Sequence, residues 1–411
     1  MATIRAFKGY RPKPELCSKI AALPYDVMTS KEAREMVKGN PLSFLHIDRA
    51  EIDLPEEVNV YSKEVYEKAR DNLDKLISES YVHDEKPVLY IYELTMNSAS
   101  QTGLVVCTSI DEYLDGTIKR HELTREDKEQ DRINHVDYCN ANTGPIFLTY
   151  RGKETIDDII KAEQEKEPVY DFVSEDGVGH RVWVIDNDEI LNSLTEEFKE
   201  IDNFYIADGH HRNASAVKVG LKRRGDGEYD KEAEFNYYLS VLFPAEQLNI
   251  LDYNRVVRDL NGFSEEEFIA RIKQAFDVVS CGYAYHPEEK HTFGMYINYN
   301  WYKLKFKEKL LRSKDVIDNL DVTILQRYIL TPILGIVDPR TDNRIDFIGG
   351  IRGLTELEQR VNSNEMKVAF SMHSTSMEEL MQIADENKIM PPKSTWFEPK
   401  LRSGIFIHKL D

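Results

Sequence analysis

The sequence has few cysteines, and they lie far apart. Its four cysteines, Cys17, Cys107, Cys139 and Cys281, form no CxxC pair. This spacing argues against both a structural zinc site and a disulfide framework, because each needs closely spaced or paired thiols. We expect four reduced, mostly buried thiols in a cytoplasmic protein.

Long hydrophobic runs are also missing. No stretch approaches the roughly 18 uninterrupted apolar residues that a membrane helix needs. The first residues, MATIRAFKGYRPKPEL, lack the apolar core of a signal peptide. We therefore expect neither a membrane partner nor export.

Positive charge is scarce relative to negative charge. The 53 Lys and Arg residues face 73 Asp and Glu residues, which gives a formal net charge of −20. Such a surface repels polyanions, so a general nucleic-acid partner is not expected and any local cluster of cations stands out. Hydrophobic residues make up 41% of the 411 residues, enough for a substantial core and more than one domain.

Helical and strand patterns follow one another in irregular order. Apolar residues at helical spacing predict helices over residues 56–80, 188–201, 264–275 and 321–334, and β-type patterns predict strands over 87–96, 101–114, 180–186 and 235–244. A last helix is expected to begin at Thr375, with Glu378 as its capping-box partner. This order favours an α+β fold over a doubly wound parallel sheet.

Residues 204–216 read FYIADGHHRNASA, a pattern typical of a strand, a tight turn and the start of a helix. Gly209 permits the sharp turn, and the first N–H groups of the helix attract an anion together with the helix dipole. His210, His211 and Arg212 add donors and positive charge at the same place. The pattern predicts a phosphate site. Histidines that merely cap the helix are the alternative.

Residues 119–132, KRHELTREDKEQDR, are densely charged. One interpretation is a solvated helix crossed by weak ion pairs. In the functional interpretation, three basic residues point at a polyphosphate donor: Lys119, Arg120 and His121. Glu122 or Asp131 would then help to hold Mg²⁺. HELTR is not HExxH, so the metalloprotease helix is absent.

Residues 391–404 read PPKSTWFEPKLRSG. Two prolines stiffen the approach to Lys393, which is followed by two hydroxyl side chains. The glycines of a P-loop are missing. We consider that this segment folds back over the site with Lys393 near the donor, or that Trp396 and Phe397 only anchor a C-terminal strand by packing.

The residues Asp208 to Arg212, followed by Ala214 and Ala216, resemble the GxxR-type phosphate motif of the ParB/sulfiredoxin superfamily, above all its variant in free-serine kinases. Over its full length the chain resembles the family known as domain of unknown function 1015. The stretches that carry this resemblance are LPYDV (23–27), NPLSFLHIDRAEIDLP (40–55), QTGLV (101–105), KRHELTREDKEQDR (119–132), ADGHHR (207–212) and MPPKSTWFEPKLRSG (390–404).

The resemblance implies an α+β fold with a discontinuous ParB/sulfiredoxin-like core. That core is expected to comprise residues 1–55 and 200–250. A large inserted α+β region would occupy residues 56–199, and an additional α+β domain residues 251–411.

The resemblance also implies a kinase that phosphorylates free L-serine, with ATP, ADP or pyrophosphate as donor and Mg²⁺ as cofactor. In such kinases a glutamate at the N-terminal turn takes the serine hydroxyl proton, and Glu15 is the residue that matches. Asp208 to Arg212 would cradle the donor phosphates, and Asp208 or Glu122 would hold Mg²⁺. The expected catalytic residues are therefore Glu15, Asp208 and His210.

Two other functions remain open at this point. The first is a nucleotide-binding regulator like the ParB proteins, which the strongly negative charge disfavours. The second is a metal-dependent hydrolase that uses His121, His210, His211 and nearby acids.

Overall fold

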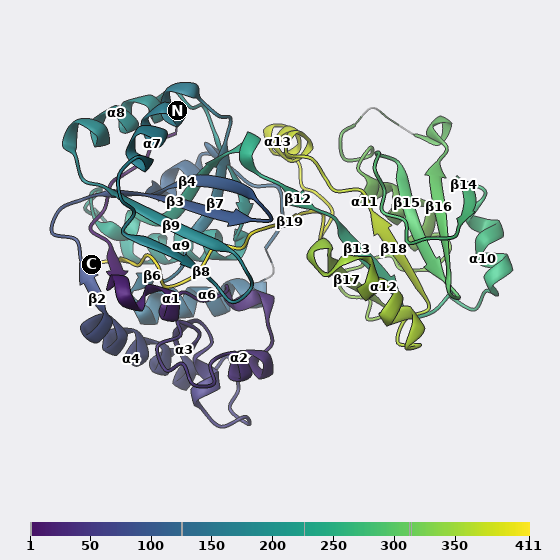
Figure 1. Ribbon diagram of the computed structural model, residues 1–411, viewed down its shortest axis with the longest axis horizontal. Helices are drawn as coiled ribbons and strands as arrows, with labels where there is room; N and C mark the ends of the chain where they lie inside the picture. Colours follow the sequence, from purple (N-terminus) through teal and green to yellow (C-terminus); the bar gives the residue numbers. More distant parts are fainter. Residues whose placement is uncertain (1, 125, 226, 312, 314) are drawn as a thin grey trace. The chain divides into compact units, whose positions relative to one another are not determined.

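The computed structural model describes residues 2–124, 126–225, 227–311, 313 and 315–411 (Figure 1). The chain divides into two compact units. Unit 1 comprises Met1–Leu248 together with Pro399–Asp411, and unit 2 comprises Asn249–Glu398. Both units combine helices with sheets, so the expected α+β class is confirmed.

Unit 1 is built on an eight-stranded mixed sheet. Its strands, in spatial order, are β5 (Ile118–Lys119), β10 (Phe204–Asp208), β7 (Ile146–Tyr150), β11 (Tyr237–Pro244), β4 (Ala99–Ser109), β3 (Leu89–Met96), β9 (Gly179–Ile185) and β8 (Tyr170–Val173). The pairs β5–β10 and β7–β11 are parallel, and the other neighbours are antiparallel. The predicted strands at 87–96, 180–186 and 235–244 are confirmed within a few residues.

Nine α-helices surround this sheet in the described part of unit 1. They are α1 (Cys17–Ile20), α2 (Ser30–Met36), α3 (Leu45–Asp48), α4 (Lys63–Ser80), α5 (Ile110–Leu114), α6 (Glu126–Cys139), α7 (Glu154–Gln164), α8 (Asp188–Lys199) and α9 (His210–Arg224). The predicted helix at 188–201 is confirmed. The helix predicted over 56–80 begins only at Lys63, and the strand predicted over 101–114 ends at Ser109, where the Ser109 side chain caps α5.

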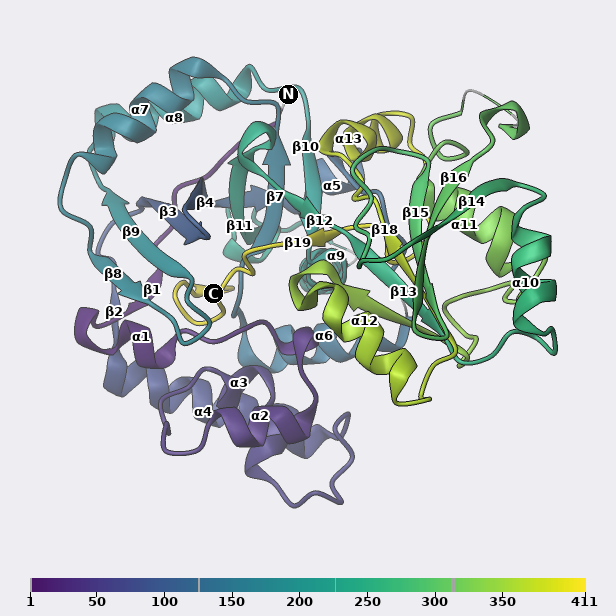
Figure 2. The ribbon, with the colours of Figure 1, turned by 45° about the vertical axis from the view of Figure 1, so that its right-hand side comes forward.

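Two hydrophobic clusters hold unit 1 together. In one of them, α7 and α8 pack on the sheet through side chains such as Ile156 and Phe198. In the other, α2, α3 and α4 pack together around Phe44 and Leu73. Figures 1 and 2 show α7 and α8 at the opposite end of unit 1 from α2, α3 and α4. Short pairs of strands complete the unit: β1 (Tyr10–Pro12) with β2 (Tyr81–His83), and β6 (Ala141–Asn142) with β20 (His408–Lys409).

Unit 2 contains a six-stranded antiparallel sheet in the order β14 (Phe276–Cys281), β16 (Asn300–Phe306), β15 (Thr292–Ile297), β18 (Val368–Met372), β13 (Tyr253–Val257) and β17 (Ile345–Gly349). Its helices are α10 (Glu265–Ile272), α11 (Asp321–Leu325), α12 (Gly353–Asn362) and α13 (Met377–Asp385). A two-residue pair, β12 (Ile250–Leu251) and β19 (Trp396–Phe397), joins the ends of the unit.

Two helix predictions in unit 2 need correction. The helix expected over 321–334 is α11 followed by a π-helical turn, Gln326–Leu330. Pro332 has no N–H to continue an α-helix beyond that turn. The capping box of α13 is formed by Ser376 and Glu379 rather than by Thr375 and Glu378. The hydroxyl of Thr375 instead donates to the carbonyl of Ser394 at 2.9 Å.

All four cysteines lie in the described part of the chain and are free thiols, and Cys17, Cys107 and Cys139 are buried as expected. Among the described residues, no helix combines the length and the apolar character needed to cross a membrane.

Candidate functional site

The strand, turn and helix predicted around the histidine motif are confirmed. Strand β10 ends at Asp208, Gly209 has a φ of 87°, and α9 begins at His210. This left-handed conformation explains the glycine, because a residue with a side chain would be strained there. Among the described residues, no side chain caps α9. The N–H groups and the dipole at the N-terminus of a helix attract anions.

The C-terminal segment of unit 1 neutralises Asp208. Its Oδ2 accepts a hydrogen bond from Lys400 Nζ at 2.8 Å, and its Oδ1 accepts one from the N–H of Gly209 at 2.8 Å. Burial opposes ionisation, but the ammonium of Lys400 outweighs it and lowers the pKa of Asp208 to about 2. A divalent cation beside this ammonium would be repelled, so Asp208 fits poorly as a magnesium ligand.

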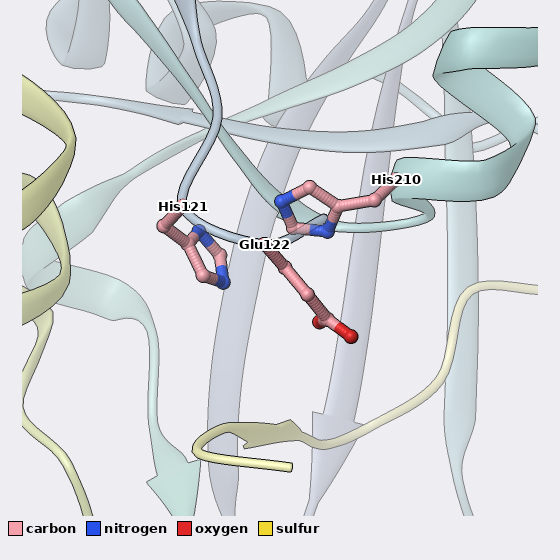
Figure 3. Close-up of side chains that lie close together, drawn as sticks. All are labelled: His121, Glu122 and His210. Atoms are coloured by element: carbon pink, nitrogen blue, oxygen red, sulfur yellow. The ribbon is translucent and has the colours of Figure 1, made fainter. Parts of the chain in front are cut away.

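Two imidazole rings meet beside this turn (Figure 3). His121 lies just after β5 and His210 opens α9, and their ring centroids are 4.4 Å apart with planes at 87°. His121 is 2% exposed and His210 is 7% exposed. Both ring nitrogens of His121 and Nε2 of His210 lack a hydrogen-bond partner among the described residues. Glu122 adds a carboxylate, and one ligand atom from each of the three residues lies within 4.8 Å of the other two.

Burial keeps both imidazoles neutral. Desolvation is the largest effect on each ring: it lowers the pKa of His121 to about 4 and that of His210 well below its usual value. The nearby carboxylate of Asp208 only partly offsets this effect in both rings. At neutral pH the two rings therefore offer ring nitrogens rather than the positive charge that the sequence motif suggested.

Arg212 supplies the charge at this end of α9. Its guanidinium donates to Ser403 Oγ at 3.2 Å and forms a 3.5 Å ion pair with Asp48. A Cβ atom at Gly144 would collide with this guanidinium, so the glycine leaves room for it. The first turn of α9 thus places the guanidinium of Arg212 directly against the backbone at Gly144.

Asp48 is the carboxylate at the centre of a small recess next to Arg212. It is 3% exposed, and Thr143 Oγ1 donates to its Oδ1 at 3.0 Å. Burial opposes its ionisation, but the guanidinium of Arg212 lowers the pKa of Asp48. The recess is lined by Asp48, Arg132, His135, Val136, Asn142, Thr143, Gly144, Ile146 and Arg212.

Helix α6 brings a second guanidinium to the recess. Arg132 pairs with Asp131 at 2.7 Å and lies 4.0 Å from the centroid of the Tyr25 ring. Asp131 also accepts from the hydroxyl of Tyr66 at 2.9 Å, so this acid has two structural partners. Each of the two guanidiniums at the recess is thus paired with a buried carboxylate, Arg212 with Asp48 and Arg132 with Asp131.

The other residues of the predicted site are distributed differently. His211 is half-buried on the first turn of α9, and Lys119 is half-buried at the end of β5. Arg120 is exposed and donates to the hydroxyl of Tyr113 at 3.4 Å. Its charge also lowers the pKa of His210, after the larger effects of desolvation, His121 and His211, so Arg120 lies near the imidazole pair.

Glu15 and Lys393 take part in none of the contacts described above for the recess and the imidazole pair. Glu15 is exposed in the 3₁₀ turn Pro14–Leu16, and none of the hydrogen bonds described above for the recess involves it. Lys393 belongs to unit 2, where its ammonium lies 5.5 Å from the ring centroid of Tyr253. The stretch 391–404 does reach the motif, but through Lys400 and Ser403.

Sequence reasoning missed the acidic half of the recess. Asp48 is 164 residues from Arg212 along the chain, and Ser403 is 191 residues from it. No periodicity links residues at such separations. The available signal was the stretch FLHIDR, in which an aspartate ends the short helix α3 and an arginine directly follows it.

Comparison with known proteins gives one family match. A family model described as "Protein of unknown function (DUF1015)" matches residues 4–323. No curated protein matches the chain.

Several solved structures resemble the chain distantly. A free serine kinase in complex with AMP has 13% identity and a TM-score of 0.37, covering 74% of this chain and 91% of that one. A conserved hypothetical protein from Pyrococcus furiosus has 13% identity and a TM-score of 0.36, covering 73% and 93%. SbnI with a C-terminal truncation, from Staphylococcus aureus, has 10% identity and a TM-score of 0.38, covering 72% and 82%. The similarity is too low to decide the chemistry, which has to be argued from the site.

Proposed function

This chain belongs to the DUF1015 family, and we propose that it transfers a phosphoryl group from a polyphosphate donor to the hydroxyl of a small molecule. Free L-serine is the first candidate acceptor, on the resemblance of the motif Asp208 to Arg212 to that of free-serine kinases. ATP, ADP and pyrophosphate are the candidate donors.

One observation carries the proposal: Arg212 stands in the first turn of an uncapped helix and lines a recess with Arg132. Phosphoryl transfer requires mainly positioning and neutralisation of phosphate charge. The helix N-terminus offers N–H donors, and each guanidinium offers a planar pair of donors that suits phosphate oxygens. Asp48 and Ser403 hold Arg212 in place for this task.

The acceptor hydroxyl needs a base, and Glu15 is our candidate on the resemblance of the N-terminal turn. Its exposed carboxylate is free to approach a bound substrate. We expect Glu15→Gln to lower kcat by about 100-fold or more, with little change in donor affinity. Steady-state kinetics together with donor titration by calorimetry would measure both. A fully active Glu15→Gln enzyme would remove Glu15 as the base.

Magnesium enters this proposal with the donor, whose phosphates it normally accompanies. It would neutralise donor charge. The protein groups at the turn do not form a suitable magnesium cage, because Asp208 is paired with Lys400 and Glu122 is grouped with two imidazoles. Mg²⁺ prefers oxygen ligands.

The test is a matrix of donors against acceptors followed by phosphorus NMR. ATP, ADP and pyrophosphate are each incubated with L-serine, L-threonine, glycerol and no acceptor, in the presence of Mg²⁺. The proposal expects one donor to be consumed in step with the appearance of O-phosphoserine. Absence of any phosphorylated acceptor across the matrix would contradict it.

A metal-dependent hydrolase is the second candidate, and the cluster of His121, Glu122 and His210 favours it. Such an enzyme would pass the phosphoryl group to water. The reactions without acceptor separate the two functions: a hydrolase releases inorganic phosphate at full rate there, whereas a kinase requires the alcohol.

A further inference from the structure

The three side chains in Figure 3 form an arrangement that the transfer of a phosphoryl group does not require. His121 and Glu122 come from the segment after β5, and His210 comes from the first residue of α9. The parallel pairing of β5 with β10 brings these segments together, since Tyr205 lies opposite Lys119. The short strand β5 thus anchors the start of the segment that carries His121 and Glu122 next to the strand that precedes α9.

The ring nitrogens lack the partners that buried polar atoms normally have. His121 has two ring nitrogens without a hydrogen-bond partner among the described residues, and His210 has one. Its proximity to the backbone of Ile206 gives His121 no hydrogen bond of ordinary geometry. Buried polar atoms are nearly always paired with protein, water or an ion. One nitrogen of each ring can bind an ion, so this place offers two buried nitrogen ligands side by side.

We propose that His121, Glu122 and His210 bind one first-row transition-metal ion, such as Zn²⁺ or Mn²⁺, in preference to Mg²⁺. Two imidazole nitrogens and one carboxylate oxygen form a donor set that suits these ions. Mg²⁺ demands oxygen ligands in near-octahedral geometry, which this set does not supply. The inference goes beyond the proposed phosphoryl transfer and rests on the donor atoms alone.

The geometry needs only a small adjustment. The three ligand atoms lie within 4.8 Å of one another. Around an ion with bonds of about 2.1 Å, neighbouring ligands are about 3–3.5 Å apart, so the most distant donors have to approach by at most about 1.3–1.8 Å. The inference assigns most of this approach to the side chain of Glu122, which is half-buried, because both imidazoles are buried.

The experiment measures metal binding directly on the full-length protein, without nucleotide or phosphate. The protein is treated with a chelator, dialysed and titrated with Co²⁺, whose visible absorption reports nitrogen coordination, and with Zn²⁺ and Mg²⁺ by calorimetry. The variants are Glu122→Gln, which preserves size and fold, and His210→Asn. The control is His83→Asn, since His83 is an exposed imidazole that stacks on Tyr10 at 4.2 Å.

The inference expects one equivalent of Co²⁺ or Zn²⁺ per chain, an affinity for Mg²⁺ at least 100-fold weaker, and binding weakened at least tenfold in both cluster variants but not in His83→Asn. Absence of saturable Co²⁺ and Zn²⁺ binding, or equal binding by wild type and Glu122→Gln, would overturn it. Phosphorus NMR of the same samples with Mg²⁺ keeps the two proposals separate. Metal binding without phosphoryl transfer refutes only the kinase, and phosphoryl transfer without metal binding refutes only the metal site.

Discussion

At the scale of single residues, the proposed function makes Arg212 the group on which donor binding should depend most. Replacement by Ala removes charge-assisted hydrogen bonds to phosphate, which are each worth about 1.5–3 kcal/mol. We expect Arg212→Ala to weaken binding of the donor by about 10–100-fold. Calorimetric titration with pyrophosphate and ATP would measure this loss.

The control for Arg212→Ala is Lys222→Ala. Lys222 lies in the last turn of the same helix and pairs with Asp137 at the surface. The substitution Lys222→Ala removes one cation from the far end of α9, so donor affinity should stay at the wild-type value. Equal losses in both variants would mean that only general electrostatic attraction is at work. Thermal unfolding of each variant separates loss of binding from loss of folding.

Asp321 in unit 2 gives a pH prediction that does not involve the site. Burial is the main cause that raises its pKa to about 7, although the N–H of His291 donates to its carboxylate at 2.9 Å. The folded state thus keeps a proton that the unfolded chain releases near pH 4. Stability conferred by this group is present below about pH 4 and is lost as the pH rises to about 7.

Asp321→Asn should remove this pH dependence. The raised pKa of Asp321 corresponds to a change of at most about 4 kcal/mol in the free energy of unfolding, because each pKa unit corresponds to about 1.4 kcal/mol. We expect the variant to be more stable than wild type at pH 8 and to vary less between pH 4.5 and pH 8. Urea unfolding across this range measures the difference. A variant with an unchanged pH profile would contradict the assignment.

At the scale of elements, the segment Pro399–Asp411 completes the site although it comes last in the chain. Lys400 pairs with Asp208, and Ser403 accepts from Arg212. We expect Lys400→Met to leave Asp208 as an uncompensated negative charge beside the uncapped helix and to weaken donor binding by about tenfold, equivalent to about 1.4 kcal/mol.

Lys409→Met is the matched control for this segment. Lys409 lies in β20 and pairs with Asp74 at 3.5 Å. Its loss should lower stability slightly, as for other surface pairs, and leave donor affinity unchanged. Donor titration of both variants tests the idea. If Lys409→Met weakened donor binding as strongly as Lys400→Met does, the segment would influence donor binding only by stabilising the fold.

Local elements could be predicted from sequence, and long-range contacts could not. The order of β10, Gly209 and α9 follows from an apolar run, a glycine and small residues, all within one stretch. The recess was missed because Asp48 and Arg212, which form an ion pair there, are 164 residues apart in the sequence. The predicted N-cap of α13 was wrong by one residue. Thr375 and Ser376 both carry a hydroxyl that can cap a helix, but the hydroxyl of Thr375 donates to the carbonyl of Ser394, and Ser376 caps α13.

At the scale of the whole molecule, unit 2 is an uninterrupted segment between the two parts of unit 1. It has its own sheet and its own cluster around Val256, Trp301 and Leu357. Its ends are close together, because Ile250 pairs with Phe397. Independent domains are often joined to their hosts in this way.

We therefore expect residues 249–398 to fold as an isolated fragment. The fragment should unfold cooperatively in urea and give a dispersed amide spectrum by NMR. A chain with random-coil shifts would show that unit 2 needs the rest of the molecule.

The net charge of −20 sets the background for the site. A molecule of this charge repels free polyphosphates over most of its surface, so binding of a polyphosphate needs cationic hydrogen-bond donors gathered at one place. In the proposed function, the guanidiniums of Arg132 and Arg212 in unit 1 are these donors. Higher ionic strength should weaken donor binding, because it screens this local attraction.

The most direct measurement is a crystal structure of the full chain soaked with pyrophosphate. The account predicts phosphate oxygens at the first N–H groups of α9, within hydrogen-bonding distance of the Arg212 guanidinium. Pyrophosphate bound elsewhere, with Arg212 still held only by Asp48 and Ser403, would contradict it.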